Sequence, residues 1–224
     1  MSEINTFRPL LAQWNFTYEC NLECKHCYSR DAAQSKEMTT EQAFKCVDIL
    51  KDSGILLMNL GGGEPLLRSD VFEVGKYAHS KGINVALSTN GSLFTEIVVK
   101  NIVSSKISVV EISIDSAIPE VHDEFRRCKG LHQKAIHAIE LAKSNGLEVH
   151  IATVITRHNH NNIEEMFKLA RNINVTNVDL HEFVDTANSG LDLTPSEWKK
   201  FYEELESLYN KYDDIKINYN DPLV

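Results

Sequence analysis

The sequence predicts an α/β protein built on a parallel β-sheet, and two patterns support this class. Short continuous apolar runs, such as residues 55–60, alternate with longer segments in which apolar residues recur at helical spacing. Continuous apolar runs are typical of strands that are buried on both faces of a parallel sheet. Six strand–helix units with short loops then imply right-handed crossovers between neighbouring strands. These patterns alone permit either an open doubly wound sheet or a curved partial barrel.

The first half of the chain holds four of the predicted strands. We expect strands, each a mostly apolar run, over residues 9–16, 55–60, 83–88 and 107–114. The helices between them are expected over residues 39–52, 69–81 and 94–104. Thr39 and Gln42 form a capping box at the start of the first helix, and Gly82 is suited to end the second.

The second half continues the same alternation. Strands are expected over residues 147–155, 176–183 and 215–219, and helices over residues 131–145, 161–172 and 194–212. Gly146 is suited to end the first of these helices. Thr194 and Pro195 supply the last helix with an N-cap and a proline at its first position. We therefore treat residues 1–224 as a single domain.

Composition excludes several classes of function. The chain of 224 residues has a formal net charge of −9 and a pI near 5.5, which argues against the basic surface that duplex nucleic acid requires. It contains no run of 18 apolar residues, and residues 1–5 carry no secretory signal. Five cysteines without a disulfide pattern indicate metal binding in a reducing cytosol. We therefore expect a cytoplasmic protein with neither nucleic acid nor a membrane among its partners.

Three cysteines after the first strand indicate a metal centre. Three residues separate Cys20 from Cys24, and two separate Cys24 from Cys27. Thiolates are soft ligands that select zinc, copper(I) or iron–sulfur centres. A closed zinc or cluster site normally has four protein ligands, and no fourth cysteine or conventional histidine pair follows here. Three thiolates on a four-iron cluster would leave one iron open. The alternative is a zinc site completed by His26 or by the distant Cys128.

Glycines and a carboxylate follow the second strand at its carboxyl end, where α/β barrels place their active sites. The run is Gly61-Gly62-Gly63-Glu64-Pro65. Glycines let a ligand approach the backbone closely, and a carboxylate there can hold an ammonium group. The alternative is a tight strand-to-helix turn that binds no ligand.

Short polar residues end the next strands. Ser88 and Asn90 lie at the end of the third strand, and Ser113 and Asp115 at the end of the fourth. Alternation along a strand predicts that Ser113 and Asp115 share one face, where they could meet ligand hydroxyl groups. The alternative for Ser88 and Asp115 is turn formation without a ligand. Asp179, His181 and Glu182, around the end of the sixth strand, could face a substrate or simply rim the barrel.

In this order the motifs resemble the radical S-adenosylmethionine (SAM) superfamily, whose signature is CxxxCxxC with an aromatic-type residue before the last cysteine. That residue is His26 here. The segments Ser88-Thr89-Asn90-Gly91, Ser113-Ile114-Asp115-Ser116 and His122-Asp123-Glu124-Phe125-Arg126 are similar to those of its SPASM/Twitch-type branch, although Ser116 stands where that branch usually has glycine. The resemblance covers roughly residues 8–185. It implies a (β/α)6 partial TIM barrel whose cluster loop follows the first strand.

The resemblance also implies a role for each motif. A 4Fe–4S cluster would be bound by Cys20, Cys24 and Cys27. The SAM amino group would be held by Gly62, Gly63 and Glu64. Arg126 would hold the SAM carboxylate, since a guanidinium is a fork of donors that suits a planar anion, and Arg127 is the alternative in register.

The remaining residues expected to bind SAM are His26, Ser88, Asn90, Ser113, Asp115 and Thr153. We expect Thr153 to face the barrel interior near the adenine. The alternative is that it only fills its strand. We expect His122 to pack locally.

The reaction implied is reductive cleavage of SAM to a 5′-deoxyadenosyl radical, which abstracts hydrogen from a substrate. The leading expectation is modification of a peptide or protein, and the alternative is maturation of haem, another tetrapyrrole or another small-molecule cofactor. An alternative of a different class is an iron–sulfur electron-transfer or binding module that does not cleave SAM. The electron would come from a ferredoxin- or flavodoxin-like donor. No general acid or base can be named from the sequence.

The related branch usually continues past a segment like Asp221-Pro222-Leu223 into a cysteine-rich domain that holds auxiliary clusters. No second cysteine cluster follows here. We therefore expect either a shortened chain or a core with one cluster and an exposed substrate face. Residues 194–224 would then begin a missing C-terminal extension.

Overall fold

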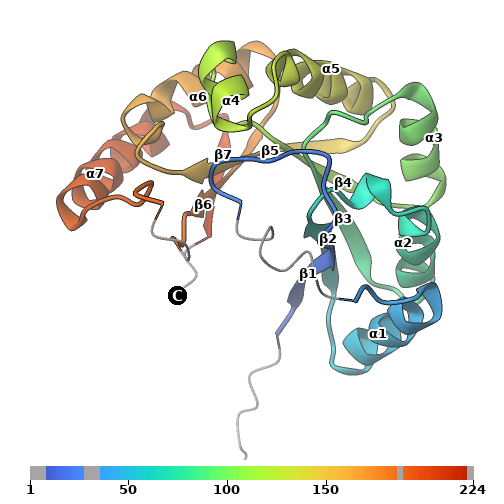
Figure 1. The fold of residues 1–224 in the computed structure, drawn as a ribbon. Coiled ribbons are helices and arrows are strands. Elements are labelled where there is room, and N and C mark those ends of the chain that lie inside the picture. Colours follow the sequence, from blue (N-terminus) through green and yellow to red (C-terminus); the bar gives the residue numbers. More distant parts are fainter. Residues whose placement is uncertain (1–8, 28–35, 186–188, 221–224) are drawn as a thin grey trace, which may run out of the picture.

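The computed structural model describes residues 9–27, 36–185 and 189–220. Seven strands form one sheet in the order β1-β2-β3-β4-β5-β6-β7, and every neighbouring pair is parallel. The sheet curves into a half-barrel, and the helices line its outer face (Figure 1). The α/β partial-barrel prediction is therefore confirmed. Residues 1–5, Tyr28 of the cysteine motif and the segment 221–223 lie outside the described residues.

The strands match the predicted apolar runs. Their bounds are β1 (Leu11–Thr17), β2 (Leu57–Gly62), β3 (Asn84–Thr89), β4 (Val109–Ser113), β5 (Glu148–Ile155), β6 (Asn177–Glu182) and β7 (Lys216–Asn220). The short seventh strand pairs with β6 and extends the sheet at its far edge.

Helices connect consecutive strands. Their bounds are α1 (Thr40–Asp52), α2 (Val71–Ser80), α3 (Glu96–Ser104), α4 (Pro119–Phe125), α5 (Leu131–Ser144), α6 (Ile163–Asn172) and α7 (Pro195–Lys211). Short 3-10 helices form at η2 (Pro65–Leu67) and η3 (His160–Asn162). The predicted capping box at Thr39 and the predicted N-cap at Thr194 are both present, and Thr194 also forms a capping box with Glu197.

Helix α4 was not among the helices expected from the sequence. Pro119 occupies the first turn, where a missing backbone N–H costs nothing, and His122 and Phe125 are buried. The helix is only seven residues long, so its apolar periodicity is too short to recognise in the sequence. Its position matters because it presents Phe125 and Arg126 to the cysteine segment.

The two faces of the sheet differ in chemistry. In β5, Val149, Ile151 and Ile155 are buried in the core under the helices, whereas His150 on the other face is partly exposed. The helix-covered face therefore supplies the hydrophobic core, and the concave face carries polar side chains. A strand in an ordinary parallel sheet is apolar on both faces, so the concave face is a candidate for function.

Candidate functional site

The cysteine segment follows β1 at the carboxyl end of the sheet and is held by the loops of three other elements. Gly63 N–H donates to the Thr17 carbonyl at 2.7 Å, and Glu64 N–H donates to the Glu19 carbonyl at 2.8 Å. Lys25 N–H donates to the Phe125 carbonyl at 3.0 Å. Farther along, the Asn90 side chain donates to Asn21 Oδ1 at 3.0 Å. The predicted position of this loop, after the first strand, is therefore observed.

The three thiols lie in a partly desolvated pocket. Cys24 is buried, and Cys20 and Cys27 are half-buried. Burial raises the pKa of Cys20, and it raises the pKa of Cys24 to about 11, although the charge of Arg126 opposes both shifts. Thiolates in this pocket therefore need additional positive charge nearby, and a metal centre supplies it.

The spacing of the thiols favours a cluster over a single ion. Among the described residues, the three cysteine sulfurs do not all lie within 4.8 Å of one another. The one group of three possible metal ligands that meets this limit lies elsewhere in the chain. A zinc ion bonds thiolates at about 2.3 Å and needs them closer together than this. Three thiols at this separation therefore fit the larger 4Fe–4S cluster better than a single zinc ion.

Gly62 and Gly63 are required by close packing against the same segment. A Cβ atom on Gly63 would lie 2.1 Å from the Glu19 carbonyl oxygen, and one on Gly62 would lie 2.3 Å from the Thr17 carbonyl oxygen. Gly62 also has a φ of 102°, which favours glycine. The glycines thus let the end of β2 seat the cysteine segment. Their expected role in SAM binding is an additional proposal.

Glu64 is fully buried beside the cysteine segment. Oε1 accepts from Thr89 Oγ1 at 2.8 Å and from Leu66 N–H at 3.2 Å, and Oε2 accepts from Asn90 N–H at 2.9 Å. Burial raises its pKa to about 6, which these donors only partly offset. The carboxylate is therefore fixed in place by uncharged donors and makes no ion pair with the described residues, although the charge of Arg126 reaches it, and an ammonium group could pair with it. Thr89 was not singled out from the sequence.

Asp115 and Arg126 form a buried ion pair. Arg126 Nε donates to Asp115 Oδ2 at 2.6 Å, and Asp115 Oδ1 accepts from Val154 N–H at 3.2 Å. Burial opposes the charge of Asp115, but Arg126 outweighs it and holds the pKa of Asp115 well below its usual range. Arg127, by contrast, is exposed. Arg126 is therefore the arginine that faces the site.

Arg126 also lies near enough to the cysteines to influence them. Its charge acts on both Cys20 and Cys24, and the terminal nitrogens make no hydrogen bond with the described residues. These nitrogens remain for an anionic ligand. His122 accepts from Asp115 N–H through Nδ1 at 3.1 Å, and burial lowers its pKa to about 4. The prediction that His122 packs locally is confirmed.

His26 stacks on Phe125, with ring centroids 4.6 Å apart and planes 6° from parallel. Burial lowers the pKa of His26 to about 4, so its imidazole is neutral at pH 7. Nδ1 is buried without a hydrogen-bond partner among the described residues. Stacking on Phe125 of α4 therefore fixes the imidazole ring next to the cysteines. Its Nδ1 atom remains available to bond a ligand.

Three predicted residues take positions that differ from the expectation. Thr153 does not face the interior, because it shares the core face of Ile151 and Ile155, and its hydroxyl donates to the Ile114 carbonyl at 2.7 Å. Asp115 lies two residues past the end of β4 at Ser113, where it forms the buried pair with Arg126. Two-residue alternation holds only within a strand.

Ser88 is the third of these residues, and it lies inside the half-barrel rather than at its rim. Its hydroxyl donates to Glu111 and accepts from Asn59 Nδ2 at 2.7 Å. Asn90, two residues farther on, supports both Glu64 and the cysteine segment. The structure therefore brings Asn90 to the cysteines and keeps Ser88 in a polar network below them.

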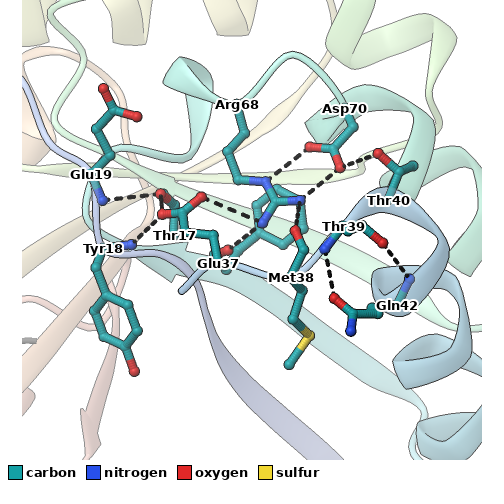
Figure 2. A network of polar contacts seen from close by, with 11 residues as sticks. Thr17, Tyr18, Glu19, Glu37, Met38, Thr39, Thr40, Gln42, Arg68 and Asp70 are labelled. Carbon is teal, nitrogen blue, oxygen red and sulfur yellow. Dashed lines mark hydrogen bonds and ion pairs between the residues drawn. The ribbon is translucent and has the colours of Figure 1, made fainter. Parts of the chain in front are cut away.

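A network that sequence reasoning missed joins the start and end of the cysteine loop. Arg68 donates to the Phe16 carbonyl through Nη1 at 3.1 Å and to the Met38 carbonyl through Nη2 at 3.2 Å. Asp70 accepts from Arg68 Nη2 at 2.7 Å and from the Thr40 hydroxyl at 2.8 Å. Figure 2 shows Arg68 at the centre of this network. Its signal in the sequence was only an arginine and an aspartate after the glycine run.

Glu37 completes the same network on the other side. Its carboxylate accepts from the Thr17 hydroxyl and, at 3.0 Å, from Tyr18 N–H, and lies 3.7 Å from Arg68 Nη1. Tyr18 and Glu19 lead directly into Cys20 (Figure 2). Arg68 and Glu37 thus fix the backbone of the residues that lead into the cysteine segment.

The carboxyl end of the parallel half-barrel thus carries three cysteines, a buried carboxylate and an arginine. Comparison with known proteins identifies the family. The Radical SAM superfamily pattern matches residues 14–170, and the chain belongs to this superfamily. The superfamily uses a 4Fe–4S cluster and SAM, so the predicted cofactors are confirmed for the family.

Similar proteins fall into two groups. An AdoMet-dependent heme synthase of Methanosarcina barkeri is 31% identical over 206 residues, which cover 88% of this chain and 59% of that protein. The mycofactocin maturase MftC of Mycolicibacterium smegmatis is 35% identical over 170 residues, covering 75% of this chain and 43% of that protein. The chain thus spans about half the length of the curated relatives it matches.

Solved structures agree on the fold. SuiB of Streptococcus suis, bound to the precursor peptide SuiA, superimposes with a TM-score of 0.81 at 15% sequence identity, covering 95% of this chain and 49% of that chain. An AdoMet-bound anSMEcpe structure gives a TM-score of 0.76 at 21% identity, covering 94% of this chain and 63% of that chain. In the described part of the chain, no helix is long and apolar enough to cross a bilayer.

Proposed function

We propose that this chain binds a 4Fe–4S cluster through Cys20, Cys24 and Cys27 and binds SAM beside it. The observation that carries the proposal is the position of the three thiols next to the buried Glu64 and Arg126, in a chain of the Radical SAM superfamily. When bound and reduced, the cluster supplies the electron that cleaves SAM to a 5′-deoxyadenosyl radical, which takes hydrogen from a substrate.

The chain's own residues bind and orient the cofactor. Glu64, which makes no ion pair with the described residues, receives the SAM ammonium group. The free nitrogens of Arg126 receive the carboxylate, while Asp115 fixes the guanidinium plane. His26, held by its stack on Phe125, lines the pocket beside the adenine. Asn90 bonds both Glu64 and Asn21 of the cysteine segment and so fixes their relative positions. Gly62, Gly63 and Ser113 complete the set that we propose, whereas Ser88 and Thr153 lie away from the cysteines and are left out of it.

We propose a peptide or protein as the substrate. Support comes from the likeness of fold to SuiB, whose structure holds a precursor peptide, and from the similarity to a mycofactocin maturase. A tetrapyrrole is the second candidate, because an AdoMet-dependent heme synthase matches 88% of this chain. In either case we propose a ferredoxin- or flavodoxin-like electron donor and a cytoplasmic location.

The test is anaerobic SAM cleavage. The protein is reconstituted with iron and sulfide, reduced with dithionite and given SAM, and 5′-deoxyadenosine is measured by chromatography and mass spectrometry. We expect the product from the wild-type protein and from Cys46→Ala, whose thiol lies on α1, and none from Cys24→Ala. A protein that carries about four irons per chain but forms no 5′-deoxyadenosine would instead support an electron-transfer or binding module.

A second measurement separates the two substrate classes. Cleavage of SAM is followed with a candidate peptide or with an iron–porphyrin precursor present, and each is analysed for mass change. A change in the peptide mass supports peptide modification. A change in the tetrapyrrole alone supports cofactor maturation and overturns the peptide proposal.

A further inference from the structure

A continuous row of polar side chains crosses the concave face of the half-barrel. It takes one residue from each strand, and we call it the interior row: Gln13, Asn59, Ser88, Glu111, His150, Asp179 and Asn218. The strand register places neighbours in the row directly opposite one another at Gln13–Asn59, Ser88–Glu111, Glu111–His150 and Asp179–Asn218. None of these residues belongs to the cysteine pocket, so the row requires its own explanation.

The centre of the interior row has the geometry of a metal site. Glu111, His150 and Asp179 each offer one ligand atom, and these atoms lie within 4.8 Å of one another. Asp179 is buried, and the other two are half-buried. Their backbone positions are fixed by β4, β5 and β6, which are central strands of the sheet and therefore rigid supports.

The charges of the side chains at this centre do not balance. His150 Nδ1 lies 2.7 Å from Asp179 Oδ2, and its Nε2 lies 3.1 Å from Glu148 Oε1. Glu111 is the third carboxylate near the same ring. Glu148 is exposed to solvent, so the enclosed carboxylates are Glu111 and Asp179, and a protonated His150 neutralises only one of these two. Enclosing uncompensated negative charge is costly, so the centre favours the binding of a cation.

An unpartnered amide oxygen lies against the same centre. Asn59 is 4% exposed, and its Nδ2 donates to Glu111 Oε2 at 2.9 Å. Its Oδ1 is buried and has no hydrogen-bond partner among the described residues. A buried amide oxygen without a partner is rare, because it loses its hydrogen bond to water without replacement. The amide beside Glu111 therefore keeps one buried polar atom that the described residues leave without a hydrogen bond.

We propose that Glu111, His150 and Asp179 bind one divalent metal ion. Carboxylate and imidazole ligands suit a hard to borderline ion such as Mn²⁺, whereas thiolates select softer centres. The site is thus chemically distinct from the cysteine pocket. The ion would neutralise the surplus carboxylate charge.

The site lies deeper in the half-barrel than the cysteine pocket. Glu111 precedes Asp115 by four residues on the β4 segment, and Asn59 precedes Glu64 by five on the β2 segment. At about 3.3 Å per residue, this places Glu111 roughly 13 Å below Asp115 along the chain direction. Any coordination positions left by the protein would open to the interior of the half-barrel.

Mn²⁺ is the probe for this proposal. The cluster-loaded protein, in its oxidised state, is titrated with Mn²⁺, and free Mn²⁺ is measured by electron paramagnetic resonance. Pulsed resonance then detects coupling between bound Mn²⁺ and an imidazole nitrogen. We expect one bound ion per chain with a nitrogen coupling.

Matched variants assign the ligands. We expect His150→Gln to abolish the nitrogen coupling, and Asp179→Asn and Glu111→Gln each to weaken binding by about tenfold or more. The control is Glu206→Gln, an exposed carboxylate on α7, which should bind as wild type. Circular dichroism confirms that each variant is folded, and Glu111→Gln replaces Asp179→Asn if the latter does not fold.

Three outcomes would overturn the proposal: Mn²⁺ binding no stronger than in His150→Gln, a nitrogen coupling that survives in that variant, or equal affinity in Glu111→Gln. None of these readouts depends on SAM cleavage. A Cys24→Ala protein should still bind Mn²⁺, so failure of this site and failure of the proposed function are distinguishable.

Discussion

Gly63 illustrates how a single residue can serve two requirements at once. Its backbone N–H holds the Thr17 carbonyl, and the space where a side chain would stand is filled by the Glu19 backbone. The sequence predicted glycines here for close approach of a ligand. The structure adds that the glycines admit the chain segment that carries the cysteines.

Gly63→Ala should therefore disturb the cysteine segment. The new Cβ would lie 2.1 Å from the Glu19 carbonyl oxygen. Only a movement of the backbone could relieve this clash. We expect the free energy of unfolding to fall by about 1–3 kcal/mol and the reconstituted iron content to fall with it. Urea unfolding and iron analysis measure both quantities.

Gly61→Ala is the matched control for this substitution. Its Cβ would meet Gln13 Nε2 at 3.1 Å, and this atom is the end of a flexible side chain that can move. We expect near wild-type stability and iron content. Equal effects of the two substitutions would contradict the close-packing explanation.

Cys24 is the most buried thiol of the three, and its replacement tests the cluster assignment directly. Cys24→Ala removes a ligand without adding volume, so the chain should fold but bind far less than one full cluster after reconstitution. Iron and sulfide content and the visible absorption of the cluster measure the loss. A Cys24→Ala protein with its full iron complement would refute the assignment, and Cys46→Ala serves as the control.

At the scale of elements, Arg68 connects the end of β1 to the start of α1. Its guanidinium reaches two backbone carbonyls, those of Phe16 and Met38, and is also paired with Asp70. It lies 4.1 Å from the Phe16 ring centroid as well. The planar fork makes these contacts simultaneously, which a lysine ammonium on a flexible stem cannot do.

Arg68→Ala should consequently destabilise the protein by about 1.5–3 kcal/mol, because it leaves the buried part of Asp70 and the two carbonyls without a donor. Arg68→Lys should recover only part of this loss. Urea unfolding gives the energies, and hydrogen exchange should show faster exchange at the end of β1. The control is Arg171→Ala, which breaks an exposed pair with Asp214 and should cost about 0–1 kcal/mol. Full rescue by lysine would show that charge alone matters.

Most helices and strands could be predicted from the sequence, because they depend on local sequence patterns. Strand runs and capped helices depend on residues close in sequence, so the alternation of both was readable. Helix α4 was not, because its seven residues are held by burial of His122 and Phe125 rather than by periodicity. Thr153 was misplaced for a similar reason, since the phase of a strand relative to the core depends on the neighbouring helices.

At the scale of the whole molecule, the order of the motifs was enough to predict that Cys20, Glu64 and Arg126 gather at one end of the sheet. Their partners could not be predicted, because they come from distant parts of the chain: Thr89 bonds Glu64 across 25 positions, and Asn59 bonds Glu111 across 52. The interior row likewise depends on strand register, which the sequence does not specify.

The interior row should make the stability of the whole protein depend on pH. Burial opposes the charge on His150, but hydrogen bonds and charges from Asp179 and Glu148 outweigh it and raise its pKa in the folded state. A group with a raised folded pKa stabilises the fold fully below its unfolded pKa, which is about 6.5 for histidine. That contribution is lost as pH rises through the folded pKa.

Comparison of wild type with His150→Gln in the presence of EDTA should reveal this dependence. We expect the wild-type advantage in unfolding free energy to be largest near pH 6, because His150 is then charged between two carboxylates, and to shrink steadily toward about pH 9. Urea unfolding across this range measures the difference, and His137→Gln, an exposed histidine on α5, provides the control. A difference that stays constant or grows with pH would mean that His150 is not stabilised as an imidazolium. The acidic centre of the half-barrel would then be neutralised by some group other than this ring.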